Sequence, residues 1–299
     1  MQRKLGIVGA TGFIGGKLAE GAAREGWKVC GFSRSGPSKA SVIGEWRQWD
    51  KLPDLGGLDA LVNLSGHPID QPWTERNRRL FHESRIGTTE TLVRALRALP
   101  AEKRPGVLIN GSAVGFYGDR RDEILAEDSN PGDGYLAELC REWEAAADPA
   151  EELGVRLLKW RTGVVLGRGG QAFEKMWKVF RLGLGGKLGD GRQWMPWIHI
   201  DDLTGGILYA LGHARMRGPV NGSAPEVARN ADFTRALGKA AHRPAIFRVP
   251  GFALRLVLDG FGGALLASQR AVPQALVQDG YKFRFPELSA ALEDLARNA

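Results

Sequence analysis

Cysteine is scarce in this chain: among 299 residues only Cys30 and Cys140 occur, each within an apolar segment. Two isolated thiols argue against a disulfide framework and a thiolate metal site, and they favour a reducing compartment, the cytoplasm. The five histidines are too widely spaced to form a recognisable ligand motif. We therefore expect no metal.

Long apolar runs and charge runs are lacking as well. No apolar run reaches the roughly 18 residues that a membrane span needs, and the first expected strand begins so near Met1 that we expect no cleaved leader. The net charge is +7, but lysine and arginine are scattered among aspartate and glutamate. This pattern indicates a solvated basic surface, so we expect neither a membrane nor a nucleic-acid partner. The oligomeric state stays open.

Apolar segments that suit strands alternate with helical segments over the first half of the chain. Strands are expected at residues 4–8, 28–32, 59–64, 107–110 and 155–161, and helices at 13–24, 75–99 and 136–153. Strands that are apolar on both faces and separated by helices predict a parallel sheet covered on both sides. The fold class is therefore α/β, a Rossmann-type doubly wound sheet.

The second half begins with a glycine-rich stretch at residues 183–191 and continues with shorter elements into a mostly helical tail. We predict an NAD(P)-binding Rossmann domain over residues 1–249, with substrate-lobe insertions at about 168–249, and a small helical C-terminal domain over residues 250–299.

Gly9, Gly12 and Gly15 recur at three-residue spacing between the first expected strand and the first expected helix. A diphosphate must approach backbone amides closely there, side chains would block it, and the helix N-terminus adds partial positive charge. In this strand-turn-helix context the pattern predicts a dinucleotide site rather than a tight turn without a ligand.

The end of the second expected strand distinguishes the two nicotinamide dinucleotides. An NAD enzyme carries a carboxylate there for the ribose 2′-hydroxyl, whereas this chain has Ser33 and Arg34. A guanidinium pairs with a 2′-phosphate through charge-assisted hydrogen bonds. We expect NADP(H) to be preferred, with NAD(H) possible; the alternative is that Arg34 is only a solvated loop charge.

Several motifs together resemble the extended short-chain dehydrogenase/reductase superfamily: the glycine turn, Asn63-Leu64-Ser65-Gly66, Ser84-Arg85, and residues 111–118, 161–167 and 197–202. The set is most similar to its atypical epimerase family protein group, also described as nucleoside-diphosphate-sugar epimerase-like. Members of that group carry a glycine-rich stretch like residues 183–191 and a C-terminal domain of unknown function, here about residues 250–297.

The resemblance implies that the glycine turn binds the diphosphate, the Ser-Arg pair binds the 2′-phosphate, and the segment after Asn63 passes the nicotinamide-side ribose. Trp49-Asp50 would lie near the adenine. The implied cofactor residues are Gly9, Thr11, Gly12, Phe13, Ile14, Gly15, Ser33, Arg34, Leu64, Ser65 and Gly66, with Arg85 and Val165 as secondary contacts.

Enzymes of this superfamily use a tyrosine, a lysine four residues later that lowers the tyrosine pKa, and a serine on the preceding strand. Ser112 fits the serine, and Tyr135 is the tyrosine in the expected window, but Leu139 stands where the lysine should be. Without the ammonium the tyrosine keeps its ordinary pKa of about 10 and transfers protons poorly near neutral pH. Tyr117 is the third catalytic candidate, unless it only supports the fold.

The glycine-rich loop is predicted to fold over a cleft and to contribute a substrate pocket. Arg192, Trp194, Trp197 and His199 offer a cation, two aromatic faces and an imidazole to a planar or anionic small molecule. The alternative is a rigid hairpin whose tryptophans pack in the core, with a structural histidine.

Two functions are compatible with these residues. The first is an NADP(H)-dependent oxidoreductase or epimerase-like enzyme that acts on a small hydroxyl or carbonyl compound held near Ser112. The second is a sensor or regulatory protein that holds NADP(H) and turns over slowly or not at all. The serine strand and glycine turn favour the first, and the absent lysine favours the second.

Overall fold

A sheet of seven parallel strands forms the centre of the computed structural model, which describes residues 2–34 and 42–297. Its order is β12-β7-β5-β4-β1-β2-β3. The strands are β1 Lys4–Val8, β2 Lys28–Ser33, β3 Glu45–Gln48, β4 Ala60–Asn63, β5 Val107–Ala113, β7 Arg156–Thr162 and β12 Gly218–Gly222. The winding reverses between β1 and β4, and such sheets bind ligands outside the carboxyl ends of the strands at this point. We call this expected ligand position the crevice. The predicted doubly wound sheet is confirmed.

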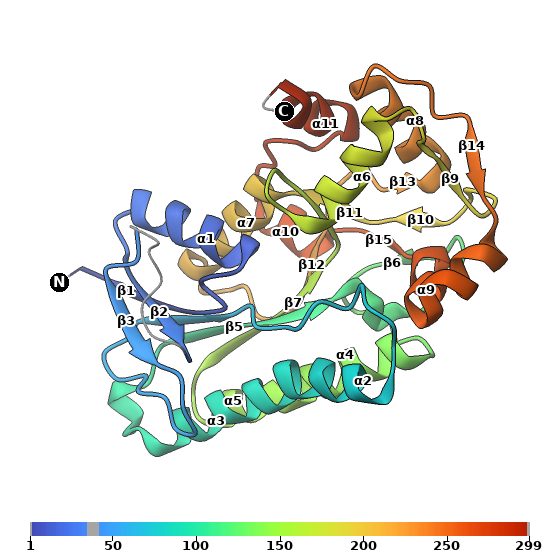
Figure 1. Cartoon of the computed structure of the whole chain (residues 1–299). Coiled ribbons are helices and arrows are strands. Elements are labelled where there is room, and N and C mark those ends of the chain that lie inside the picture. Colours follow the sequence, from blue (N-terminus) through green and yellow to red (C-terminus); the bar gives the residue numbers. More distant parts are fainter. Residues whose placement is uncertain (1, 35–41, 298–299) are drawn as a thin grey trace.

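Helices cover both faces of this sheet (Figure 1). Leu5 and Ile7 of β1 pack in the apolar cluster beneath α1 and α7, whereas Val8 packs in the cluster beneath α3. Both faces of the strand are therefore buried, which explains its continuous apolar sequence. The covering helices are α1 Phe13–Arg24, α2 Glu75–His82, α3 Thr88–Ala98, α4 Tyr135–Ala147, α5 Pro149–Glu152 and α7 Ile200–Gly212.

A second lobe is built mainly from the chain after β7 and lies beyond the carboxyl ends of the central strands (Figure 1). Phe285 and Leu292 share one core with Phe173 and Phe233, so the predicted C-terminal domain packs into residues that precede it. Within the described residues, no helix is long and apolar enough to cross a membrane. The helices are α6 Gln171–Arg181, α8 Asn230–Ala240, α9 Gly251–Leu266, α10 Gln274–Asp279 and α11 Leu288–Arg297. The short strands are β6 Ile124–Leu125, β8 Val164–Leu166, β9 Gly186–Leu188, β10 Trp194–Met195, β11 Trp197–His199, β13 Ala228–Arg229, β14 Phe247–Val249 and β15 Arg270–Ala271.

The single helix predicted over residues 75–99 is interrupted by a π-helical turn, η1 Glu83–Gly87, between α2 and α3. Such wider turns inside helical segments are frequent at functional sites, because they change the direction in which side chains project. Here the turn carries Arg85, whose guanidinium lies close to Gly66 at the carboxyl edge of the sheet.

Candidate functional site

The turn between β1 and α1 leaves no room for side chains. Gly9 has a φ of +84°, and a Cβ there would lie 2.9 Å from the carbonyl oxygen of Leu64. A Cβ on Gly15 would lie 2.2 Å from the carbonyl oxygen of Gly9, and the Gly12 amide donates to that same oxygen over 2.9 Å. The glycines are therefore required by the turn itself and by its contact with the chain after β4.

The backbone amides in the first turn of α1 have no capping side chain that would compete with a ligand for them. Gly12 is the N-cap residue, no side chain caps the helix, and the first turn holds no acidic residue. Thr11 is exposed, while Phe13 and Ile14 are half-buried. This combination of free amides and positive helix dipole suits an anionic group such as a diphosphate.

At the end of β2, Ser33 is half-buried and Arg34 is exposed, and the Ser33 carbonyl accepts a hydrogen bond from the Trp49 amide over 2.8 Å. Trp49 packs edge-on against Phe32, with ring centroids 6.2 Å apart. Asp50 accepts from the Leu52 amide over 2.8 Å, so its carboxylate closes a local turn. Arg34 thus occupies a position where an NAD site would have a carboxylate.

The segment after β4 is fixed by a buried polar network. Asn63 accepts from the Ser65 hydroxyl over 2.6 Å and donates to Asn110 of β5 over 2.8 Å. Thr89 of α3 donates to Asn110 over 3.2 Å and accepts from the Trp143 indole over 3.1 Å. This network holds Ser65 beside the crevice and joins β4, β5, α3 and α4, and it could not be predicted from the sequence because its members lie far apart in the chain.

Arg85 is a half-buried cation that has no counter-charge among the residues that the structure describes. Its guanidinium lies 5.3 Å from the Trp143 ring centroid and donates only long hydrogen bonds, to the Phe81 carbonyl at 3.3 Å and the Ser84 hydroxyl at 3.5 Å. Nη2 would lie 3.1 Å from a Cβ on Gly66. Burial lowers the Arg85 pKa, and no carboxylate among the described residues offsets it. A buried unpaired charge is costly, so this guanidinium is suited to an anionic ligand.

Val165 lies on β8, next to Ile198 of β11, and packs half-buried against the core beneath α1. The residues that follow it approach the glycine turn, because a Cβ on Gly167 would lie 2.7 Å from Cζ of Phe13. The structure thus brings Val165 to the same edge of the sheet as the glycine turn and the segment after β4.

Ser112 lies in a buried network rather than at an open surface. Its hydroxyl donates to Glu144 of α4 over 2.7 Å, and Arg161 of β7 clamps the same carboxylate through two hydrogen bonds of 2.8 and 2.9 Å. Arg161 also donates to the Tyr117 hydroxyl over 2.9 Å, and Tyr117 donates to Asn221 over 2.8 Å. Ser112 and Ala113 are the last two residues of β5, and because side chains alternate along a strand they project to opposite faces of the sheet.

The burial of Ser112 and Tyr117 argues against the catalytic roles predicted for these two residues. Ser112 is 3% exposed and Tyr117 is 0% exposed. Burial raises the Tyr117 pKa, and Arg161 lowers it. Both hydroxyls are engaged by protein groups, so their placement supports a structural role. The charged partners that hold these hydroxyls in place are Glu144 and Arg161, neither of which was among the predicted site residues.

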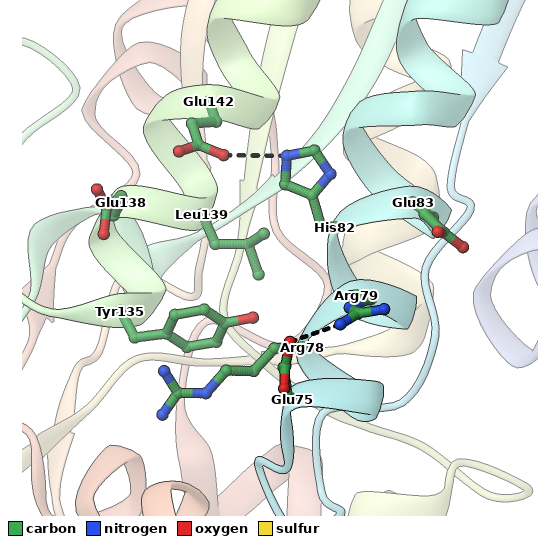
Figure 2. A pocket seen from close by; sticks show the side chains of 9 residues that line it. All are labelled: Glu75, Arg78, Arg79, His82, Glu83, Tyr135, Glu138, Leu139 and Glu142. Carbon is green, nitrogen blue, oxygen red and sulfur yellow. Dashed lines mark hydrogen bonds and ion pairs between the residues drawn. The ribbon is translucent and has the colours of Figure 1, made fainter.

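Tyr135 begins α4 and points toward α2, into an open cavity of about 520 Å³ between the two helices (Figure 2). The Arg78 guanidinium lies 4.7 Å from its ring centroid, and the Trp73 ring lies 5.0 Å away. Burial raises the Tyr135 pKa, while Arg78 and Arg85 lower it. Leu139, one helical turn later, is buried against apolar side chains, so no ammonium from α4 reaches the phenol.

The residues predicted for a substrate pocket are not brought together. Trp197 is 0% exposed in the core of the second lobe. His199 is 2% exposed and packs against Phe285, with ring centroids 4.1 Å apart and planes tilted by 42°. It caps α7 by accepting from the Asp201 amide over 3.2 Å. The C-terminal segment covers both side chains, an arrangement that the local sequence does not reveal. Their placement does not support substrate contact.

Trp194 and Arg192 lie nearer the surface. The Trp194 indole donates to Asp122 over 2.8 Å, and its ring lies 4.5 Å from the guanidinium carbons of both Arg229 and Arg270. Arg192 is exposed, and its carbonyl accepts from Arg229 over 2.7 Å. Across residues 2–34 and 42–297, no group of three or more histidine, cysteine, aspartate or glutamate side chains is positioned to hold a metal ion.

A doubly wound parallel sheet with bare amides at its first crossover defines the class of Rossmann-fold nucleotide-binding proteins. Within that class, the chain belongs to the NAD dependent epimerase/dehydratase family, whose model matches residues 5–221. Residues 249–295 match a second model, Domain of unknown function (DUF1731). The resemblance drawn from the motifs is confirmed.

Relatives of similar length share this organisation. The chain is 36% identical over 302 residues to "Epimerase family protein SDR39U1 homolog, chloroplastic" of Arabidopsis thaliana, covering 97% of this chain and 86% of the relative. A crystal structure of human epimerase family protein SDR39U1 (isoform2) with NADPH matches with a TM-score of 0.90 and 36% identity, over 99% of this chain and 100% of that one. A Bacillus cereus UDP-glucuronic acid 4-epimerase, in complex with UDP-glucuronic acid and NAD, shares the fold at 19% identity, with a TM-score of 0.77 over 98% of both chains.

Proposed function

We propose that this protein binds NADP(H) along the carboxyl edge of its central sheet. The observation that carries the proposal is the β1–α1 turn, where Gly9 and Gly15 leave no space for side chains and the first amides of α1 have no side-chain cap. A diphosphate fits such a turn because backbone amides and the helix dipole both favour negative charge. The NADPH in the solved human relative supports the same cofactor here.

Arg34 is the residue proposed to select the phosphorylated cofactor. Its side chain is exposed at the end of β2, beside Ser33, and the position holds no carboxylate that would repel a 2′-phosphate. Thr11, Gly12, Phe13 and Ile14 complete the diphosphate site at the start of α1. NAD(H) would bind the same edge more weakly, because it lacks the phosphate that the guanidinium pairs with.

The nicotinamide half is proposed to lie against Leu64, Ser65 and Gly66, with Val165 on the opposite side of the crevice. Arg85 supports this assignment, because its uncompensated guanidinium beside Gly66 is suited to the negative charge of the cofactor. The bound nicotinamide would supply hydride transfer, and the protein residues would orient it.

The reaction is proposed to be an oxidation, reduction or epimerisation of a small hydroxyl or carbonyl compound. Among the three candidate hydroxyl groups, Tyr135 borders an open cavity, so it is the candidate proton donor and Arg78 and Arg85 are its neighbouring cations. A second candidate function is a sensor that holds NADP(H) without turnover. The hydrogen bond from Ser112 to Glu144 favours the sensor, because it occupies the expected substrate-orienting hydroxyl.

The cytoplasm is the proposed compartment, supported by two buried free cysteines that form no disulfide within the described chain.

The central experiment is titration calorimetry of the purified protein with NADPH, NADP, NADH and NAD. NADPH and NADP should bind at least about tenfold more tightly than their dephosphorylated counterparts, as expected for a charge-assisted contact. Absence of heat with all four would overturn the proposed function. Loss of NADPH absorbance with a panel of carbonyl compounds would then separate the enzyme from the sensor.

A further inference from the structure

The loop from β4 to α2, residues 64–74, starts at the proposed cofactor site and ends beside α9 of the second lobe, where the Trp73 amide donates to Asp259. At its start, the Leu64 carbonyl oxygen would lie 2.9 Å from a Cβ on Gly9, so the loop touches the glycine turn. The loop then passes Ser65 and Gly66, which are proposed to lie beside the nicotinamide-side ribose. One side of the crevice is therefore formed by the glycine turn and this loop in direct contact.

The opposite side of the crevice is closed by the segment that leads into α6. A Cβ on Gly170 would lie 2.6 Å from Cε1 of Phe13, and a Cβ on Gly167 would lie 2.7 Å from Cζ of the same ring. Phe13 is the first residue of α1. The second lobe is thus packed directly on the helix whose amides are proposed to bind the diphosphate.

One ion pair joins these two sides. Lys175 Nζ of α6 lies 2.5 Å from Asp70 Oδ2 of the loop, although the residues are 105 positions apart in the chain. These contacts form a continuous ring of protein. It runs from Gly9 through Phe13 and α6 to Lys175, crosses the ion pair to Asp70, and returns along residues 64–70 to Gly9. A dinucleotide that lies along the glycine turn and Gly66 would be encircled by protein.

The loop is anchored firmly on both sides of Asp70. The His67 amide donates to the Ser84 hydroxyl over 2.8 Å, and the Trp73 amide donates to Asp259 of α9 over 2.9 Å. The Lys175 side chain is 64% exposed and that of Asp70 is 24% exposed. Exposed ion pairs are weak and exchange readily with water, whereas the other links are backbone hydrogen bonds and buried packing. The ion pair is therefore the link that opens most easily.

We propose that the Asp70–Lys175 ion pair is a clasp that closes the second lobe over the bound cofactor and limits the rate at which the cofactor enters and leaves. The proposal rests on the proposed function, since it requires NADP(H) in the crevice. The clasp raises the free-energy barrier that the cofactor crosses when it enters or leaves the crevice. It therefore slows association and dissociation together and leaves the dissociation constant nearly unchanged.

Stopped-flow fluorescence of NADPH with the full-length protein tests the clasp. Lys175→Met and Asp70→Asn should each raise both rate constants about threefold, and the charge-reversed pair Asp70→Lys with Lys175→Asp should restore the slow rates. Lys178→Met removes the same charge one turn further along α6, where the lysine forms no ion pair with another described residue, and should leave the rates unchanged. Added salt should speed dissociation from the unmodified protein and have less effect on the single variants.

Two results overturn the proposal in distinguishable ways. If NADPH binds but Lys175→Met and Asp70→Asn dissociate at the original rate, or Lys178→Met accelerates dissociation equally, the clasp is wrong and the proposed function stands. If the unmodified protein binds no NADPH, the proposed function fails and the clasp fails with it.

Discussion

The Ser112 hydroxyl donates a hydrogen bond of 2.7 Å to Oε1 of Glu144, which lies two and a half turns into α4. The bond joins the end of a central strand to the helix that covers it. Arg161 neutralises the same carboxylate, so the serine is part of a paired and buried charge site. A hydroxyl held in this way contributes to stability and is not free to orient a substrate.

Substitution Ser112→Ala should therefore lower the free energy of unfolding by about 1–3 kcal/mol, the range for hydrogen bonds to charged groups. Affinity for NADPH should stay within about twofold, because the hydroxyl does not reach the crevice. Urea denaturation and NADPH titration of the same preparations measure both quantities. Unchanged stability together with loss of hydride transfer would contradict the structural role and return Ser112 to the catalytic site.

Removal of the cation from this network should have a larger effect. Arg161→Met leaves the Glu144 carboxylate buried without its partner, so we expect a loss of about 3–5 kcal/mol in unfolding free energy. The matched comparison is Arg94→Met, which removes an exposed arginine of α3 that donates a hydrogen bond to Thr91 and has no carboxylate partner among the described residues. A loss of less than about 1 kcal/mol for Arg161→Met would mean that the clamp adds little to stability.

Adjacent glycines in α1 provide a sharp test of the proposed diphosphate turn. A Cβ on Gly15 would lie 2.2 Å from a backbone oxygen, whereas a Cβ on Gly16 would lie 3.8 Å from its nearest neighbour. Gly15→Ala should distort the turn and weaken NADPH binding at least about tenfold. Gly16→Ala should preserve binding and stabilise the helix by about 0.5–1 kcal/mol. Calorimetry and thermal unfolding check both variants, and equal NADPH affinity in the two would remove the argument for the turn.

Replacement of Arg34 separates recognition of the 2′-phosphate from recognition of the rest of the cofactor. Arg34→Gln should weaken NADPH binding about tenfold or more and leave NADH binding unchanged, because only NADPH carries the phosphate. Arg24→Gln, at the exposed end of α1, removes the same charge elsewhere and serves as the control. Parallel loss for NADPH and NADH in Arg34→Gln would indicate a general effect of charge on association.

Local patterns in the sequence were sufficient to predict the central architecture. The residues at 4–8 and 13–24 form a strand and a helix at the predicted bounds, because their apolar period and the intervening glycines depend on neighbours in the chain. The helical stretch predicted over residues 75–99 is present from Glu75 to Ala98, but its π-helical turn at Glu83–Gly87 was not predicted, because the apolar period alone does not show where the hydrogen-bond pattern of a helix widens.

The candidate site was harder to predict because long-range contacts decide it. Ser112 projects toward Glu144 and Arg161, which lie 32 and 49 positions later in the chain, so the local sequence does not show which face of the sheet its hydroxyl occupies. Likewise, Trp197 and His199 follow a glycine-rich loop typical of a cleft, yet residues more than 80 positions later cover them. Sequence periodicity carries no information about such partners.

His199 leads to a prediction on acid stability. Burial lowers its pKa below the ordinary value of 6.5, although Asp201, Asp294 and Asp202 raise it and Arg284 lowers it further. The unfolded chain therefore takes up a proton as the pH falls through about 6.5, while the folded protein stays unprotonated until a lower pH. The free energy of unfolding should fall over this window, by at most about 1.4 kcal/mol per pH unit.

The variant His199→Asn isolates this contribution. An asparagine retains an oxygen able to accept from the Asp201 amide at the start of α7, but it does not titrate. Urea denaturation between pH 7 and pH 5 should give a shallower pH dependence for the variant than for the unmodified protein. Because the buried Asp202 and all other carboxylates are common to both proteins, the difference between the two slopes belongs to His199. Equal slopes would mean that the imidazole is protonated as easily in the folded state as in the unfolded chain, despite its burial against Phe285.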